Sequence, residues 1–494
     1  MADIAWGTPR ARLVLATTII GSGMAMLDST IVNVALPRIG DELEASVTDL
    51  QWILNGYLLA LASLILVAGS LGDRFGRRRV YVIGVVWFGL SSLLCGVATN
   101  VWTLVLARVL QGIGGALLTP GALAILQSSF GRDARSRAIG AWSGLSGVAT
   151  AIGPLVGGLL VQVWSWRLAF LINLPVAALC VWLALKSVPE SKDDEAGHPD
   201  YVSSGVGAIG LALLTGGIVE QSYLWAGLGM VALIVFGVVQ ARSSDPLVPP
   251  ELFRDRTFVL SNGLTFLMYG ALGAVMWLLV LQLQVSAGYS PTAAGLASVP
   301  ITIIMLLTSA QSGRLAQKYG PRAQLVIGPM LVGAGMLLLR NAVPGSSYLT
   351  DVLPGVLVFG VGLAAVVAPV TATVLAAAPD RHAGIASGVN NAVARTGSLL
   401  AVAVLPSVVG LTGDRYSDPA ALTSSWQMAL VLCAIAAAAG GLMALGVDNK
   451  VLDVPAEPDE CPHTGECMHL GVEGPPTHIK PGTHELSGAQ QAGQ

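Results

Sequence analysis

The segment GSLGDRFGRRR, residues 69–79, joins two apolar runs at 50–71 and 80–99. Its glycines allow a tight turn and a close approach of two helices. Asp73 can accept hydrogen bonds at a helix end or pair with a basic residue of another inner loop, and the arginines favour the inner side of a membrane. A run of charges alone is usually a solvated loop, but the joint spacing is more specific. We therefore predict an inner loop between two membrane spans, with its signature at Gly69, Asp73, Arg74, Gly76 and Arg77.

The composition of the whole chain agrees with this interpretation. Of the 494 residues, 54% are hydrophobic and 11% are charged, and the mean hydropathy is +0.71. A soluble domain carries roughly 25% charged residues, so these values exclude a soluble enzyme, a disordered protein and a coiled coil. The net charge of −3 gives no basic excess that would indicate a nucleic-acid partner. The five cysteines are too few and too scattered for a disulfide framework.

A membrane-spanning helix needs about 20 mostly apolar residues, and the chain offers fourteen such runs. We therefore predict an all-α polytopic membrane protein. With the N-terminus inside, 19 Arg and Lys residues fall in inner segments and four in outer segments, as the positive-inside rule requires. The middle runs at 202–221 and 224–241 leave room only for a very tight turn. The predicted spans are 13–36, 50–71, 80–99, 101–125, 137–161, 168–187, 202–221, 224–241, 258–282, 292–313, 322–340, 350–376, 384–410 and 426–447.

The two ends of the chain are predicted to lie in the cytoplasm. The first apolar run could imitate a signal peptide, but it is too long and contains Asp28, so we interpret it as a retained helix after a short N-terminus at 1–12. The tail at 448–494 is polar and rich in Pro and Gly, which predicts disorder.

Two ionisable residues interrupt apolar spans. An ionisable side chain in hydrocarbon is costly, so its default interpretation is functional. Counted along their helices, Asp28 and Arg108 each lie roughly 10 Å below the outer face, and the two could pair. Either they form a static ion pair, or Asp28 is a proton site: burial favours a neutral carboxyl, a nearby cation favours the ionised form, and moving the partner switches between them. Arg395, near the inner end of its span, is a third candidate, although a long Arg can also snorkel to the interface.

With these motifs the chain resembles the major facilitator superfamily. The 69–79 segment matches its signature inner loop, RVLQGIGGA at 108–116 its proton-coupling pattern, and GVATAIGPLVGG at 147–158 its antiporter motif. LDSTIVNVALP at 27–37, WSWRLAFLINLP at 164–175 and DPLVPPELF at 245–253 are similar to motifs of the fourteen-span drug:H⁺ antiporter branch. In the antiporter motif, Pro154 bends the helix and small residues let neighbours pack closely; its residues are Gly153, Pro154, Gly157 and Gly158.

The resemblance implies two six-helix bundles, at 13–187 and 258–447, joined by a segment at 188–257 that carries two extra helices. It implies alternating access of a central cavity, and export of an amphiphilic compound in exchange for protons. Asp28 and Arg108 would form the coupling pair and Asp73 the inner gate. Asp28 would take a proton in the outward-open state, release it inside, and then pair with Arg108 or a substrate cation.

The second half departs from the family pattern in two respects. It contains no additional acid in the tenth or neighbouring spans, so a monocation, zwitterion or neutral amphiphile fits better than a dication. SGRLAQKYGPR at 312–322 is a degenerate copy of the signature loop without its acid.

Polar and aromatic residues in the spans are candidates for the substrate cavity, because aromatic rings hold flat apolar or cationic ligands. Each alone is more often a packing or interfacial residue. The cavity candidates are Trp52, Asn55, Tyr57, Gln111, Asn262, Phe266, Tyr269, Trp277 and Gln282, and the second half adds the polar residues Asn390, Asn391 and Arg395.

Other motifs give little reason to expect a cofactor. GVGAIG at 205–210 fits a dinucleotide pattern but lies in an apolar span, where helix packing explains it better. No lysine follows a glycine, so the chain has no Walker A motif, and the proton gradient is the expected energy source. The tail contains a possible but non-standard zinc set at Cys461, His463, Cys467 and His469.

The sequence therefore predicts a plasma-membrane transporter that exports drug-like compounds, with amphiphilic substrates, protons and the lipid bilayer as partners. One alternative is the same fold with a lipid, siderophore or endogenous metabolite as cargo, and another is a membrane enzyme or a non-transporting sensor. No H-E-x-x-H or G-x-S-x-G motif lies in a span, which argues against an enzyme. Substrate, proton stoichiometry and oligomeric state stay open at this point.

Overall fold

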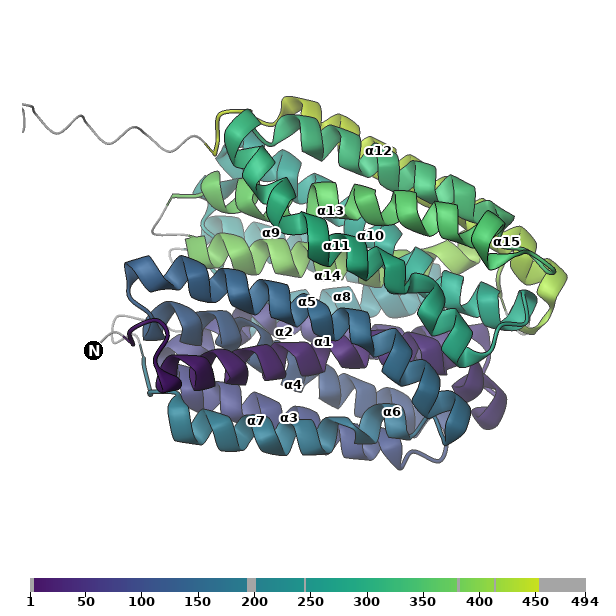
Figure 1. Cartoon of the computed structure of the whole chain (residues 1–494), viewed down its shortest axis with the longest axis horizontal. Coiled ribbons are helices and arrows are strands. Elements are labelled where there is room, and N and C mark those ends of the chain that lie inside the picture. The colour runs from purple at the N-terminus through teal and green to yellow at the C-terminus, as the bar shows by residue number, and fades with distance from the viewer. Residues whose placement is uncertain (1–3, 193–200, 244–245, 380–382, 413–414, 453–494) are drawn as a thin grey trace, which may run out of the picture. The chain divides into compact units, whose positions relative to one another are not determined.

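The computed structural model describes residues 4–192, 201–243, 246–379, 383–412 and 415–452. Cys461, His463, Cys467 and His469, the possible zinc set, lie outside the described residues. Within the described part the structure is helical and has no strand. Figure 1 shows the long helices side by side along a common direction. This confirms the all-α fold class.

The helices follow the order of the predicted apolar runs, and several begin at strong capping residues. Ser46 and Asp49 form a capping box at the start of α2, and Asn100 and Thr103 form another at the start of α4. The first half consists of α1 (Pro9–Leu43), α2 (Val47–Phe75), α3 (Arg77–Gly96), α4 (Val101–Ser129), α5 (Arg132–Val163), α6 (Leu168–Leu171) and α7 (Asn173–Ser187).

Two inserted helices and the second half follow. The inserted pair is α8 (Tyr201–Val219) and α9 (Tyr223–Arg242), so both predicted middle runs are helices. Gln221 lies in the tight turn between them and has φ +55°. The rest consists of η1 (Pro250–Arg254), α10 (Arg256–Leu281), η2 (Gln282–Ser286), α11 (Pro291–Tyr319), α12 (Arg322–Leu338), η3 (Leu339–Asn341), η4 (Tyr348–Val352), α13 (Leu353–Ala376), α14 (Ala383–Val408), η6 (Arg415–Ser417), α15 (Pro419–Met443) and η7 (Ala444–Gly446).

The described residues contain twelve helices long and apolar enough to cross a membrane, or thirteen if the bent helix α2, with a 53° angle between its parts, counts as one span. We predicted fourteen spans. Helices α6 and α7 together form one of the twelve, Leu168–Ser187. The remaining predicted span, 137–161, lies within α5, where the described apolar helix covers only Ile152–Val163.

Several helices are longer than the apolar runs that predicted them. Helix α1 continues to Leu43, although its run was predicted to end at 36, and Pro37 lies inside the helix. The prediction stopped at Pro37 because proline usually ends a helix. Helix α1 nevertheless continues through this proline. Its last turn contains the polar residues Asp41 and Glu42.

The two halves meet along α2–α14 and α5–α11, and α8 packs against both α2 and α14. Towards the predicted outer side, residues of both halves share one buried core, for example Leu36 and Phe170 with Leu283 and Leu411. Towards the predicted inner side, the first half has a core of its own, at Val14, Tyr81 and Leu126 among others, that includes no residue of the second half. The halves are therefore sealed together at the predicted outer side and have separate cores towards the inner side.

Hydrogen bonds of three side chains on the sealed side cross from one half to the backbone of the other. The Gln51 side chain donates to the carbonyl of Val402 at 2.8 Å, the Tyr416 hydroxyl to the carbonyl of Ala45 at 2.7 Å, and the Gln284 side chain to the carbonyl of Val34 at 3.0 Å. We call this region, where α1 and α2 meet the second half, the outer seam. Its polar links supplement the apolar core and fix the alignment of the halves.

Candidate functional site

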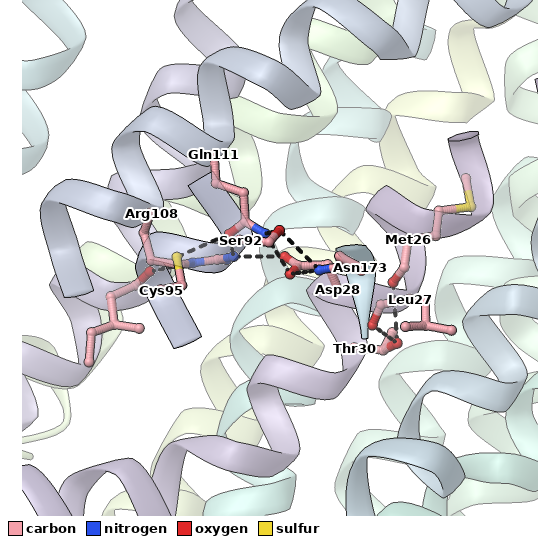
Figure 2. Close-up of polar contacts among 10 residues, drawn as sticks. Met26, Leu27, Asp28, Thr30, Ser92, Cys95, Arg108, Gln111 and Asn173 are labelled. Atoms are coloured by element: carbon pink, nitrogen blue, oxygen red, sulfur yellow. Dashed lines mark hydrogen bonds and ion pairs between the residues drawn. The ribbon is translucent and has the colours of Figure 1, made fainter. Parts of the chain in front are cut away.

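The centre of the site is an ion pair inside the first half. The Asp28 carboxylate on α1 lies 2.7 Å from Nη1 of Arg108 on α4, and the two side chains are 0% and 1% exposed (Figure 2). The two residues therefore pair in this structure, as their estimated depths allow. Because neither group reaches solvent in this conformation, the carboxylate depends on protein donors for its charge to be tolerated.

Neutral side chains complete the network around Asp28. Nε2 of Gln111 donates to Oδ1 of Asp28 at 2.8 Å, and Nδ2 of Asn173 donates to the same oxygen at 3.0 Å. Both amides also lie within hydrogen-bond distance of Ser92 Oγ, at 2.8 and 3.2 Å. Figure 2 shows these side chains converging on the carboxylate from α1, α3, α4 and α7. Both carboxylate oxygens of Asp28 thus have strong donors.

Hydrogen bonds and two aromatic rings fix the position of the Arg108 side chain. Its Nε donates to the carbonyl of Ile53 at 3.2 Å, and its Nη1 donates to Oε1 of Gln111 at 2.5 Å. The guanidinium lies 4.3 Å from the centre of the Tyr57 ring and 5.8 Å from that of Phe170, a geometry that favours a cation. Tyr57 and Gln111, predicted to line the cavity, are therefore neighbours of the ion pair.

Ser92 and Asn173 are not among the site residues that the sequence predicts. Ser92 lies in an ordinary apolar span, with no local signal. Asn173 lies inside WSWRLAFLINLP, one of the motifs that carried the family resemblance, and a polar residue at that position of a span could have been selected.

The signature loop joins α2 to α3 in a single residue. Asp73 pairs with Arg77 of the following helix at 2.7 Å, not with a basic residue of another loop. Gly76 takes φ +107°, and a Cβ there would lie 2.7 Å from Oε1 of Glu190, whose carboxylate also accepts from the Arg78 backbone at 3.1 Å. The turn thus requires glycine and is tied to the segment after α7.

The antiporter motif packs α5 against both halves. A Cβ on Gly157 would lie 3.0 Å from Ile31 Cα on α1, and a Cβ on Gly158 would lie 2.6 Å from Thr292 Cα on α11. Pro154 lies within α5, and its carbonyl oxygen would be 2.2 Å from a Cβ on Gly295 of α11. The small residues therefore allow close contact of α5 with α1 and, across the halves, with α11.

The remaining first-half candidates, on α2, have different environments. Nε1 of Trp52 donates to Glu220, in the turn directly after α8, at 2.7 Å, so it links α2 to the inserted pair. Asn55 is fully buried, and neither polar atom of its side chain has a hydrogen-bond partner in the described structure.

The second-half candidates separate into two groups. Asn390 on α14 donates to Asn262 and Thr265 of α10 at 3.2 and 3.0 Å, close to a small apolar crevice between α10 and α13 to which Thr265 and Tyr269 contribute. Trp277 and Gln282 are instead buried, and Gln282 donates to the carbonyl of Ala342 at 2.9 Å, as a packing residue would. Of the others, Phe266 is exposed, and Asn391 is partly exposed.

Arg395 lies in the middle of α14, twelve residues after Ala383. At 1.5 Å per residue this is about 18 Å from the start of the helix, so the predicted position near the inner end is wrong. The error arose because the polar residues around Arg395 resemble a span end. An arginine side chain does not snorkel over that distance to the inner interface.

No group of three or more potential metal ligands occurs among the residues that the structure describes.

The chain's similarity to known proteins is extensive. The model of the Major Facilitator Superfamily matches residues 18–402 and 263–464. The chain belongs to the Major Facilitator Superfamily, whose members are membrane transporters and not enzymes.

Curated relatives are named for resistance and export. The "Tetracenomycin C resistance and export protein" of Streptomyces glaucescens is 35% identical over 82% of this chain and 77% of its own length. The "Puromycin resistance protein pur8" of Streptomyces alboniger is 33% identical over 90% of this chain and 92% of its own length. Among solved structures, a POT family transporter in complex with 5-aminolevulinic acid has a TM-score of 0.69 at 15% identity, covering 91% of this chain and 98% of that chain, and so shares the fold.

Proposed function

We propose that the chain is a secondary transporter of the plasma membrane that exports drug-like or other amphiphilic compounds in exchange for protons. The observation that carries the proposal is the Asp28 carboxylate, fully buried among membrane-spanning helices and held by Arg108, Gln111 and Asn173. The relatives named for antibiotic resistance and export support the class of cargo.

The geometry around Asp28 suits a reversible proton site. A carboxylate with three donors is stable when ionised, and it becomes a good proton acceptor once a conformational change removes those donors. In the present conformation the outer seam is closed and the inner cores are separate. We therefore assign the pair of Asp28 and Arg108 seen here to the stage after proton release towards the inside.

The charge of the pathway limits the cargo. Asp28 is neutralised by Arg108, and the helices α10 to α15 contain no Asp or Glu. Without a buried pair of acids, a dication would have no counter-charge, so a neutral, zwitterionic or singly charged amphiphile is the preferred substrate. The energy source is the proton gradient, with no cofactor, and the positive-inside rule assigns both termini to the cytoplasm.

The test uses the purified full-length protein in liposomes with an imposed pH gradient, with ethidium and puromycin as probes. We expect proton-driven transport of at least one probe in the wild type, and its loss in Asp28→Asn although the variant still inserts and keeps its helical content. Asp28→Glu should retain part of the activity. Unchanged pH-dependent transport in Asp28→Asn would refute the assignment of Asp28, and no response of any probe to the gradient would refute proton-coupled export.

A further inference from the structure

Arg395 is a charge without a partner in the second half. It lies mid-helix in α14, is only partly exposed, and forms no ion pair or hydrogen bond with any residue that the structure describes. None of α10 to α15 contains an acid that could balance it. An arginine keeps its charge in proteins, and an unbalanced charge at membrane depth is costly, so its position calls for an explanation in the mechanism.

Arg395 lies level with the ion pair of the first half. Helices α2 and α14 are antiparallel and are aligned by the hydrogen bonds from Gln51 to the carbonyls of Val402 and Ala403, at 2.8 and 3.1 Å. Tyr57 follows Gln51 by six residues along α2, and Arg395 precedes Val402 by seven residues along α14. These steps correspond to about 9 and 10 Å in the same direction, so both residues lie at the same depth.

Tyr57 is close to both cations. Its ring packs at 4.3 Å against Arg108, which pairs with Asp28, and its hydroxyl is within electrostatic range of Asp28, Arg108 and Arg395. Tyr57 is therefore the residue through which the surroundings of the ion pair and of Arg395 meet.

Few other titratable groups share this environment. The Cys95 thiol of α3 is within electrostatic range of Asp28 and Arg108, and the Tyr269 hydroxyl of α10 is within range of Arg395. The described polar contact that α7 brings to Asp28 is the neutral Asn173, and α5 and α10 bring no described charged side chain to it. Arg108 and Arg395 are thus the two cations found in the described surroundings of Asp28 and Tyr57.

We propose that Arg395 is a positioning residue for proton coupling: with the outer seam closed, its charge disfavours the protonated form of Asp28, and opening of the outer seam removes that influence. The proposal rests on the proposed role of Asp28 as the proton site.

The sign of the effect follows from the charges. When Asp28 is ionised, its charge cancels that of Arg108, and Arg395 faces a neutral pair. When Asp28 is protonated, Arg108 becomes an uncompensated cation at the level of Arg395, and the two repel through a medium of low dielectric constant. Proton binding is therefore disfavoured in this conformation and favoured when α14 moves away from α2. Such a difference releases the proton inside and takes it up outside, which is the direction an exporter needs.

The test is an infrared titration of the purified full-length protein in lipid nanodiscs. The stretching band of a protonated carboxyl that is absent in Asp28→Asn reports Asp28 directly and requires no substrate. In Arg395→Gln the protonation midpoint should move up by about 0.5 to 1 pH unit. Arg395→Lys, which keeps the charge, should remain near the wild type, and so should Arg314→Gln, which removes an exposed cation of α11 in the same half.

A second arm tests the dependence on conformation. Cysteines introduced by Gln51→Cys and Ala403→Cys and joined by a short bismaleimide hold the outer seam closed, and the full effect of Arg395→Gln should persist in the joined protein. An unchanged midpoint in Arg395→Gln, joined or not, would overturn the inference while leaving proton coupling through Asp28 intact. A missing Asp28 band, or gradient-driven transport that survives Asp28→Asn, would instead contradict the proposed function.

Discussion

At the scale of single residues, one buried acid and its donors account for the polar chemistry of the first half. A buried Asp28 carboxylate without donors would strongly destabilise the fold. Three side chains from α4 and α7 donate to it and stabilise its charge. Of these, Asn173 gives the most specific test, because it contacts the acid without carrying charge and its own Oδ1 has no partner in the described structure.

Asn173→Leu should destabilise the protein and ease protonation of Asp28. Loss of one donor to a buried carboxylate costs about 1–3 kcal/mol, and the ionised form loses more than the neutral form, so the pH midpoint of transport should rise. Thermal unfolding and the pH profile of probe transport measure the two effects. Asn341→Ala, at the exposed end of the second-half segment η3, serves as the control, and equal behaviour of the two variants would contradict the role of Asn173.

The acid and its cation could be predicted from sequence because charge in an apolar span is conspicuous. Asn173 and Ser92 could not, since a single amide or hydroxyl in a span is common and its partner is set by how four helices pack. The missing hydrogen-bond partners of Asn55 depend likewise on how the helices pack, which apolar runs alone leave undetermined.

At the scale of helices, glycines determine which elements approach closely. Helix α5 touches α1 through Gly157 and α11 through Gly158, so one helix face serves both the first half and the contact between halves. The sequence predicted this motif as a site of close packing, but which helices it joins follows only from the structure. Likewise α8 and α9 were predicted as spans, whereas the position of α8 against both α2 and α14 was not.

Gly158→Ala should therefore weaken closure of the halves more than it weakens the first half itself. The added Cβ would meet backbone atoms of Thr292 and Pro291 at 2.6 and 2.7 Å, which cannot move aside without separating α5 from α11. Overpacking of this kind costs about 1–3 kcal/mol, so the outward-open population should rise about fivefold or more. Labelling of Ala403→Cys by a membrane-impermeant maleimide measures it. Gly227→Ala on α9, where nothing lies within 4 Å, should have no effect, and similar labelling in both variants would argue against the role of this contact.

At the scale of the whole molecule, the shared outer core and separate inner cores describe one end of an alternating cycle. A transporter that cycles must keep its closed state only modestly stable, so that it can open again. Asn55 offers a way to do so. It is one helical turn along α2 from Gln51, on the side that meets α14, and both polar atoms of its side chain are buried without a described partner.

Asn55→Leu should therefore stabilise the closed outer seam. A buried amide without hydrogen bonds costs about 1–3 kcal/mol, and this cost disappears when opening lets water reach the side chain, so leucine removes a penalty that only the closed state carries. We expect slower maleimide labelling of Ala403→Cys, slower probe transport and an unchanged or higher melting temperature. Thr373→Val removes an equally buried and unpartnered hydroxyl of α13, away from the seam, and should change melting but not labelling. Faster labelling in Asn55→Leu would show that the amide instead helps to hold the two halves together.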